Sequence, residues 1–122
     1  MKTLAYTLDL IDSPDLIEKY KQYHKNVWPE VLNGIKKSGV LNSRIFLLGT
    51  RLFLYMEVTD DYQLNHFQDY ASGEREKEWE MLMRSFQRPV PEAKPDEWWA
   101  EMELIYDLNS QLASVSNQNE KE

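Results

Sequence analysis

The stretch VLNSRIFLLGTRLFLYMEV, residues 40–58, decides the fold of this 122-residue chain. Two runs rich in strand-forming residues, VLNSRIFLL and RLFLYMEV, flank a short turn that contains a glycine, which is the pattern of a β-hairpin. Large side chains stand at both odd and even positions of each run, so both faces of the hairpin carry apolar groups. We expect one face to cover a core and the other to need a partner.

Alternating strands are expected on either side of this hairpin. Residues 3–10 (TLAYTLDL) place their apolar side chains on one face, with the period of a half-buried strand, at Leu4, Tyr6, Leu8 and Leu10. Residues 98–108 (WWAEMELIYDL) alternate in the same way, as expected of a final strand, at Met102, Leu104, Tyr106 and Leu108.

Two regions between these strands have helical spacing. The sequence DSPD, residues 12–15, supplies a capping residue and an early proline, so a helix is expected from there to about His24. Pro29 suits the first turn of another helical segment closed by Gly39, either a separate helix or the second half of one kinked helix. The second region, residues 60–86, is broken at ASGE, residues 71–74.

The element order is strand, helix, strand, strand, helix, strand. This order is that of a ferredoxin-like α+β domain, a βαββαβ sandwich in which helices cover one face of a four-stranded antiparallel sheet. We expect a single domain over residues 1–108 and a disordered polar tail over residues 109–122. A homodimer, formed through the open sheet faces or by strand exchange, would cover the other face.

Composition excludes several classes of protein. Lysine plus arginine total 14 against 21 aspartate plus glutamate, and the net charge of −7 argues against nucleic-acid binding. No apolar run approaches the roughly 20 residues needed to span a membrane, and MKTLAYTLDL at the start lacks a signal-peptide core, so a cytoplasmic protein is expected. The chain has no cysteine, and with only His24 and His66 a multi-histidine metal site within one subunit is not expected.

His24 is the most informative single residue because its unperturbed pKa lies near neutrality. Tyr20 stands four residues earlier, so on a helix the two side chains project to the same side. Trp28 would follow them only if the helix continued past the corner that Pro29 introduces. The spacing alone favours a packed aromatic stripe with a satisfied histidine over a site.

Other polar and aromatic residues allow two interpretations each. Arg44, beside the hairpin, either binds a polar ligand or pairs with a neighbouring acid. The adjacent Trp98 and Trp99 cannot both face the core of a strand, so one should line a pocket or an interface, and aromatic rings are good platforms for sugars. Five carboxylates are candidate general bases, although a solvated role is more common for such residues; they are Glu30, Glu57, Asp96, Glu97 and Glu101.

At YKQYHKNVWPEV (residues 20–31), RIFLLGTRLFLYMEV, EWEMLM and WWAEMELIYDL, the sequence resembles the L-rhamnose mutarotase family. The resemblance covers roughly residues 1–108. Its most specific part is the signature Y-x-x-x-H-x-x-x-W-P-E, which here comprises Tyr20, His24, Trp28, Pro29 and Glu30.

The resemblance implies a dimeric ferredoxin-like isomerase of the aldose 1-epimerase type, which interconverts the α and β anomers of a 6-deoxy sugar without cofactor or metal. The family's proton donor falls on His24 and its substrate-binding tyrosine on Tyr20. A tryptophan-bearing helix that lines the sugar site falls around Trp79, where this chain has Glu78-Trp79 instead of two tryptophans. A second substrate-contacting tyrosine falls on Ser43.

We therefore predict a mutarotase for L-rhamnose, with L-fucose or another 6-deoxy sugar as the alternative. A pyranose changes anomer when an acid protonates the ring oxygen and a base removes the proton of the anomeric hydroxyl. His24 is the expected acid, Tyr20 orients the sugar or relays a proton, and the base is a carboxylate or a water. Two other classes stay open, a dimeric ferredoxin-like oxygenase or haem-handling protein and a non-catalytic sugar-binding domain.

Overall fold

The hairpin expected at residues 40–58 is present in the computed structural model, which describes residues 1–63 and 73–120. Strand β2 (Val40–Leu48) pairs antiparallel with β3 (Arg51–Val58), and Leu48 stands opposite Arg51 at the turn. Gly49 has a φ of 61°, the left-handed conformation in which a glycine carries no steric cost.

Strand β1 (Lys2–Leu10) completes the centre of the sheet by pairing antiparallel with β3 along its whole length. Both β4 (Gln87–Arg88) and β5 (Ala100–Glu101) pair antiparallel with β1, and the sheet order is β2-β3-β1-β4 with β5 also beside β1. Two short strands thus share the place of the fourth strand, and the predicted ferredoxin-like α+β class is confirmed.

The prediction of a long final strand over residues 98–108 is wrong. Only β5 pairs, the Met102 amide still donates to the Ala5 carbonyl at 2.8 Å, and the chain then leaves the sheet. Residues 102–120, here called the C-terminal arm, project away from the domain and end in helix α5 (Leu108–Glu120), where a disordered tail was expected. The large apolar side chains that produce the alternation in the arm are exposed instead of packed in the core.

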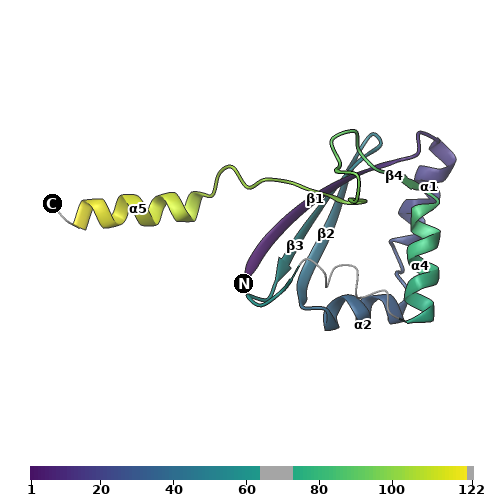
Figure 1. The fold of residues 1–122 in the computed structure, drawn as a ribbon, viewed down its shortest axis with the longest axis horizontal. Coiled ribbons are helices and arrows are strands. Elements are labelled where there is room, and N and C mark those ends of the chain that lie inside the picture. The colour runs from purple at the N-terminus through teal and green to yellow at the C-terminus, as the bar shows by residue number, and fades with distance from the viewer. Residues whose placement is uncertain (64–72, 121–122) are drawn as a thin grey trace.

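Three helices lie on one side of the sheet and the C-terminal arm leaves on the other (Figure 1). They are α1 (Pro14–Tyr23), α2 (Pro29–Lys37) and α4 (Glu74–Arg84). Ser13 caps α1 through its side chain, and Pro14 and Pro29 occupy the first turns of α1 and α2 as predicted. The helical pattern expected at residues 64–70 lies outside the described residues.

The core fills the space between this helical layer and the sheet. Alternate residues of β1 point into it, and Leu8 and Leu10 are almost completely buried beside Leu52 of β3. From the helical side, Tyr20, Val31, Trp79 and Met83 complete the same cluster. None of the helices within residues 1–63 and 73–120 is both long and apolar enough to cross a membrane.

The turn of the hairpin offers a test of the fold. A Cβ atom at position 49 would meet nothing within 4 Å, so the cost of Gly49→Ala is backbone strain alone. We expect this variant to lose about 1 kcal/mol of unfolding free energy, measured by urea denaturation. Gly49→Asn should lose clearly less, because asparagine tolerates the left-handed region, and equal losses for the two variants would contradict the assigned turn.

Candidate active site

A cavity of about 350 Å³ opens between the helical layer and the sheet. Small-molecule sites in proteins span roughly 300–1,000 Å³, and the volume lies within that range. Most of the wall is apolar, and polar groups come from α1, β2, α4 and β4. The polar and aromatic members of the wall are Tyr20, His24, Ser38, Ser43, Trp79, Glu80, Gln87 and Trp99.

His24 lies in this wall, directly after the end of α1. Its Nδ1 atom is 2.9 Å from the backbone carbonyl oxygen of Tyr20. A carbonyl oxygen can only accept, so Nδ1 carries the hydrogen and donates. The bond fixes the ring and leaves Nε2 as the atom that can exchange a proton with a ligand.

Burial lowers the pKa of His24 below the ordinary histidine value of about 6.5, and the bond to the Tyr20 carbonyl is a smaller effect in the opposite direction. Burial therefore favours the neutral imidazole. In the neutral ring Nε2 has a lone pair that can accept a proton, and a ring that has taken up this proton can donate it again.

Tyr20 and His24 lie on the same side of α1, as the spacing predicts, with ring centroids 4.4 Å apart. The Tyr20 side chain is buried, and its hydroxyl oxygen accepts a hydrogen bond from Nε2 of Gln87 at 3.1 Å. The Gln87 Oε1 atom in turn accepts from Nε1 of Trp98 at 2.8 Å. Burial raises the pKa of Tyr20 to about 12, with the Glu80 carboxylate acting in the same direction and the Gln87 amide against it.

Trp79 of α4 forms the aromatic part of the wall, where the resemblance places a sugar-lining tryptophan. Its ring meets His24 at 5.5 Å in an edge contact and is 4% exposed. Trp28 packs against Trp79 at 5.2 Å, and the Arg75 guanidinium lies over the Trp28 ring at 3.8 Å. Trp28 is not among the residues that line the cavity, so it supports Trp79 from outside the wall.

Ser43 and Arg44 point to opposite faces of β2 because side chains alternate along a strand. Ser43 lies in the cavity wall, opposite Met56 of β3. Arg44 stands opposite Tyr55 on the other face of the sheet, which none of the helices in the described residues covers, and it is exposed. The structure therefore keeps Arg44 away from the cavity and leaves Ser43 as the β2 side chain that can contact a ligand through a hydroxyl.

The sequence gives no reason to single out Glu80 or Gln87. Glu80 lines the cavity one residue after Trp79, and its carboxylate pairs with Arg84 at 3.0 Å. Gln87 meets Tyr20 from 67 positions away in the chain, a distance that no local pattern encodes. None of the five carboxylates named as candidate bases lines the cavity. Within the described ranges, no group of three or more histidine or acidic side chains is arranged to hold a metal ion.

A small apolar cavity with a histidine of fixed tautomer and a buried tyrosine defines a site for proton transfer on a small polar molecule. Comparison with known proteins identifies it further. The family model described as L-rhamnose mutarotase matches residues 3–108, so the chain belongs to this family of isomerases that act on sugar anomers.

Individual relatives cover nearly the whole chain. A Dictyostelium discoideum protein is 44% identical over 113 residues, which are 88% of this chain and 90% of that protein. An L-fucose mutarotase of Xanthomonas campestris pv. campestris is 35% identical over 116 residues and 93% of each chain. The crystal structure of an L-rhamnose mutarotase from Formosa agariphila has a TM-score of 0.64 at 23% identity, over 88% of this chain and 99% of that one.

The tautomer and charge of His24 can be tested by NMR titration. We expect the His24 ring to titrate below 6.5 and, above its pKa, to carry its hydrogen on Nδ1 in a ¹⁵N spectrum. His24 then binds a proton more readily in the unfolded chain than in the folded one. Its contribution to the unfolding free energy is therefore fully present above the pKa of His24 in the unfolded chain and is lost as the pH falls below that pKa.

The variant His24→Gln assigns the His24 signals. It should also reduce the loss of unfolding free energy as the pH falls below about 6.5, the unfolded pKa of histidine. A midpoint above 6.5, or a hydrogen on Nε2 in the neutral ring, would contradict this account of the site.

Proposed function

We propose that this chain interconverts the α and β anomers of a 6-deoxy sugar in the cavity beside His24. The observation that carries the proposal is the His24 ring, fixed by its Nδ1 bond and placed next to Tyr20 in a mostly apolar wall. Apolar residues of α2 in the same wall, among them Val31 and Ile35, suit the methyl group that distinguishes a 6-deoxy sugar from its parent hexose.

The proton path follows from the state of His24. Nε2 takes the proton of the anomeric hydroxyl, the bond between the anomeric carbon and the ring oxygen breaks, and the electron pair moves to the ring oxygen. The imidazolium then gives its Nε2 proton to that oxygen, and the open chain rotates about its first carbon-carbon bond. Ring closure on the other face retraces these steps, so His24 serves as base and as acid in turn.

Tyr20 would bind the ring oxygen through its hydroxyl hydrogen and stabilise the negative charge that develops there. Its raised pKa keeps that hydrogen on the phenol oxygen throughout. Trp79 and Ser43 complete the binding surface, one as a platform and one as a polar contact on the sheet side. Glu80 lines the same cavity and can hold a sugar hydroxyl.

The preferred sugar is either L-rhamnose or L-fucose. The description of the family supports L-rhamnose, and the L-fucose mutarotase that matches 93% of the chain supports L-fucose. Glu78 and Ser43 stand where the resemblance to the L-rhamnose family places a tryptophan and a tyrosine, so L-fucose is kept as the second candidate. The two sugars differ in the configuration of two hydroxyl groups, so the polar side chains of the wall decide between them.

Magnetisation-transfer NMR with purified protein tests the activity directly. We expect accelerated anomer exchange for at least one of L-rhamnose and L-fucose, and a loss of about 100-fold or more for His24→Ala, since a positioned proton-transfer group contributes about that factor. Lys25→Ala changes the neighbouring exposed residue and should leave the rate unchanged. Unchanged exchange of every 6-deoxy sugar with folded wild-type protein would refute the proposal.

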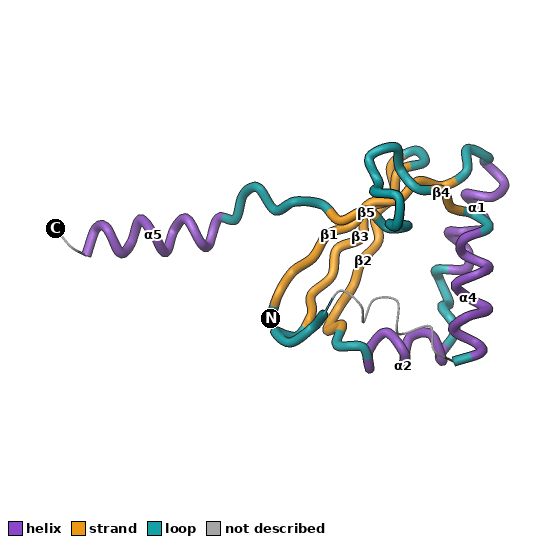
Figure 2. The backbone as a smooth tube through the Cα atoms, in the orientation of Figure 1, coloured by secondary structure: helices purple, strands orange, loops and turns teal. Residues whose placement is uncertain are grey.

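We further propose a homodimer that forms on the helix-free face of the sheet. This face carries Phe46 and Leu48 of β2 and Phe53 and Tyr55 of β3, and Leu48 is 85% exposed. An uncovered surface of this kind is costly in water and marks an interface. It lies on the side from which the C-terminal arm leaves the domain (Figure 2).

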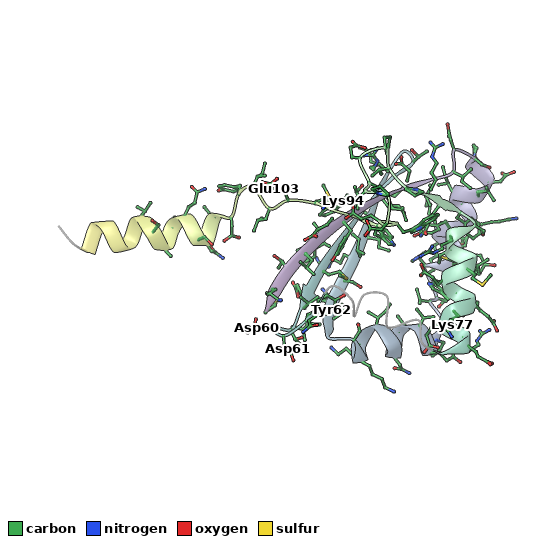
Figure 3. All side chains as sticks on the ribbon, in the orientation of Figure 1. Asp60, Asp61, Tyr62, Lys77, Lys94 and Glu103 are labelled. Atoms are coloured by element: carbon green, nitrogen blue, oxygen red, sulfur yellow. The ribbon has the colours of Figure 1, made fainter. Side chains whose placement is uncertain are left out.

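The arm supplies the second part of this interface. The arm leaves the sheet after β5 and extends away from it, and its described side chains from residue 102 to residue 115 are exposed (Figure 3). Its large apolar residues are all exposed: Met102, Leu104, Ile105, Tyr106, Leu108, Leu112 and Val115. A second copy packed on the helix-free face would lie next to the arm and bury these groups.

Sedimentation velocity tests the dimer. Phe46→Glu places a charge on the helix-free face and should weaken the dimer by roughly 100-fold, or about 2.7 kcal/mol. Met81→Glu introduces the same charge at an exposed apolar residue on α4 and should leave the dimer intact. A monomeric wild-type protein, or equal effects of the two variants, would contradict the proposed interface.

No particular feature of the cavity favours an oxygenase or a haem-handling protein. A non-catalytic sugar-binding domain would bind these sugars in calorimetry and leave their exchange rates unchanged, so the NMR assay distinguishes it. The cytoplasmic location expected from the sequence stays a prediction.

A further inference from the structure

The hydrogen bonds around Gln87 have a direction that the residue types impose. The indole Nε1 of Trp98 can only donate, so the side-chain atom of Gln87 that faces it must be the oxygen. The amide nitrogen of Gln87 then faces Tyr20 and can only donate, so the Tyr20 hydroxyl oxygen accepts. The indole N–H of Trp98, which can only donate, therefore fixes the direction of the hydrogen bond between Gln87 and Tyr20.

The consequence concerns the hydroxyl hydrogen of Tyr20. Because its oxygen receives the Gln87 hydrogen bond, this hydrogen must point elsewhere. Tyr20 and Gln87 both line the cavity, and the hydroxyl donates to no described side chain or carbonyl in the structure. The cavity is thus the direction left for the hydrogen, and a ligand with an acceptor oxygen would receive it.

The surroundings of Gln87 hold its side-chain amide in this orientation. Gln87 is 6% exposed, and it is one of two buried polar or charged residues among the described part of the chain. A buried amide costs free energy unless it forms hydrogen bonds, and both Nε2 and Oε1 of Gln87 form one. The Arg84 guanidinium over the Trp98 ring at 4.7 Å holds the first donor in place.

We propose that Gln87 is a positioning residue, which, held by Trp98, turns the Tyr20 hydroxyl into a hydrogen-bond donor aimed at the ring oxygen of the sugar. The inference rests on the proposed mutarotase function and deepens it. It gives Gln87 of β4 and the loop that carries Trp98 a part in the reaction, through Tyr20. Neither residue belongs to the family signature between Tyr20 and Glu30. The same arrangement selects ligands that present an acceptor oxygen at this point.

Two substitutions at Gln87 distinguish an effect on the direction of the Tyr20 hydrogen bond from an effect on side-chain packing. Gln87→Met keeps the length of the side chain and removes the donor. Gln87→Glu keeps the shape, still accepts from Trp98, and now accepts from Tyr20 as well, so it turns the Tyr20 hydrogen away from the sugar. We expect each to lower kcat of anomer exchange roughly tenfold, the worth of one directed hydrogen bond, with a smaller change in KM. Gln22→Met, at an exposed glutamine of α1, is the matched control and should retain wild-type kinetics.

A double-mutant cycle decides whether Gln87 acts through Tyr20. Tyr20→Phe alone should lower kcat about as much as Gln87→Met, and adding Gln87→Met to Tyr20→Phe should cost no more than about twofold further. Losses that multiply would show that Gln87 acts on its own and would overturn the inference. Near-ultraviolet circular dichroism confirms that each variant is folded.

The two proposals fail in different ways. Wild-type protein without exchange activity on any 6-deoxy sugar would refute the proposed function and this inference together. An active wild-type protein with an independent Gln87 effect, or with wild-type kinetics in Gln87→Glu, would overturn the inference alone and leave the mutarotase function standing.

Discussion

The corner between α1 and α2 is the constraint on which the site depends. Pro29 disfavours a helical conformation at the residue before it, and Trp28 accordingly has φ −57° and ψ 136°. The helix that carries Tyr20 ends at Tyr23, and after this corner α2 starts in a new direction at Pro29. Of the two possibilities left open by the sequence, separate helices or one kinked helix, the structure shows the first.

This corner gives the cavity its walls. Because α1 ends there, His24 stands just beyond the helix, and its Nδ1 atom binds the Tyr20 carbonyl oxygen, which also accepts the backbone N–H of His24. Because α2 departs at an angle, its apolar side chains close the cavity from another side. Trp28 at the corner packs on Trp79 and joins α4 to the same assembly.

Local patterns predict most of the fold because each element is encoded over a few residues. The hairpin, β1, α1, α2 and α4 follow from alternation, helical spacing, caps and glycine or proline positions. The final strand does not follow, because alternation in residues 102–108 records which groups need covering and says nothing about which chain covers them. Helix α5 differs for a related reason, since a polar sequence with weak periodicity gives little local signal in either direction.

Local patterns also predict one part of the site, and the other part depends on tertiary packing. Tyr20 and His24 are four residues apart on one helix, so their proximity is predictable, and strand alternation separates Ser43 from Arg44 once β2 is recognised. Gln87, Trp98 and Trp99 come from segments whose position depends on tertiary packing, and Glu80 is one acidic residue among many in an acidic helix. The pKa of His24 also depends on burial, which lowers it and favours the neutral ring, and burial is set by tertiary packing that no local pattern encodes.

A crystal structure of the wild-type protein with L-rhamnose or L-fucose bound is the most direct test of the central claim, that the cavity between α1, α2, α4 and the sheet is the reaction site. The account predicts a sugar ring in this cavity, with the anomeric hydroxyl near Nε2 of His24 and the ring oxygen within hydrogen-bond distance of the Tyr20 hydroxyl. A sugar bound only on another surface, such as the helix-free face of the sheet, while the cavity stayed without sugar, would contradict it.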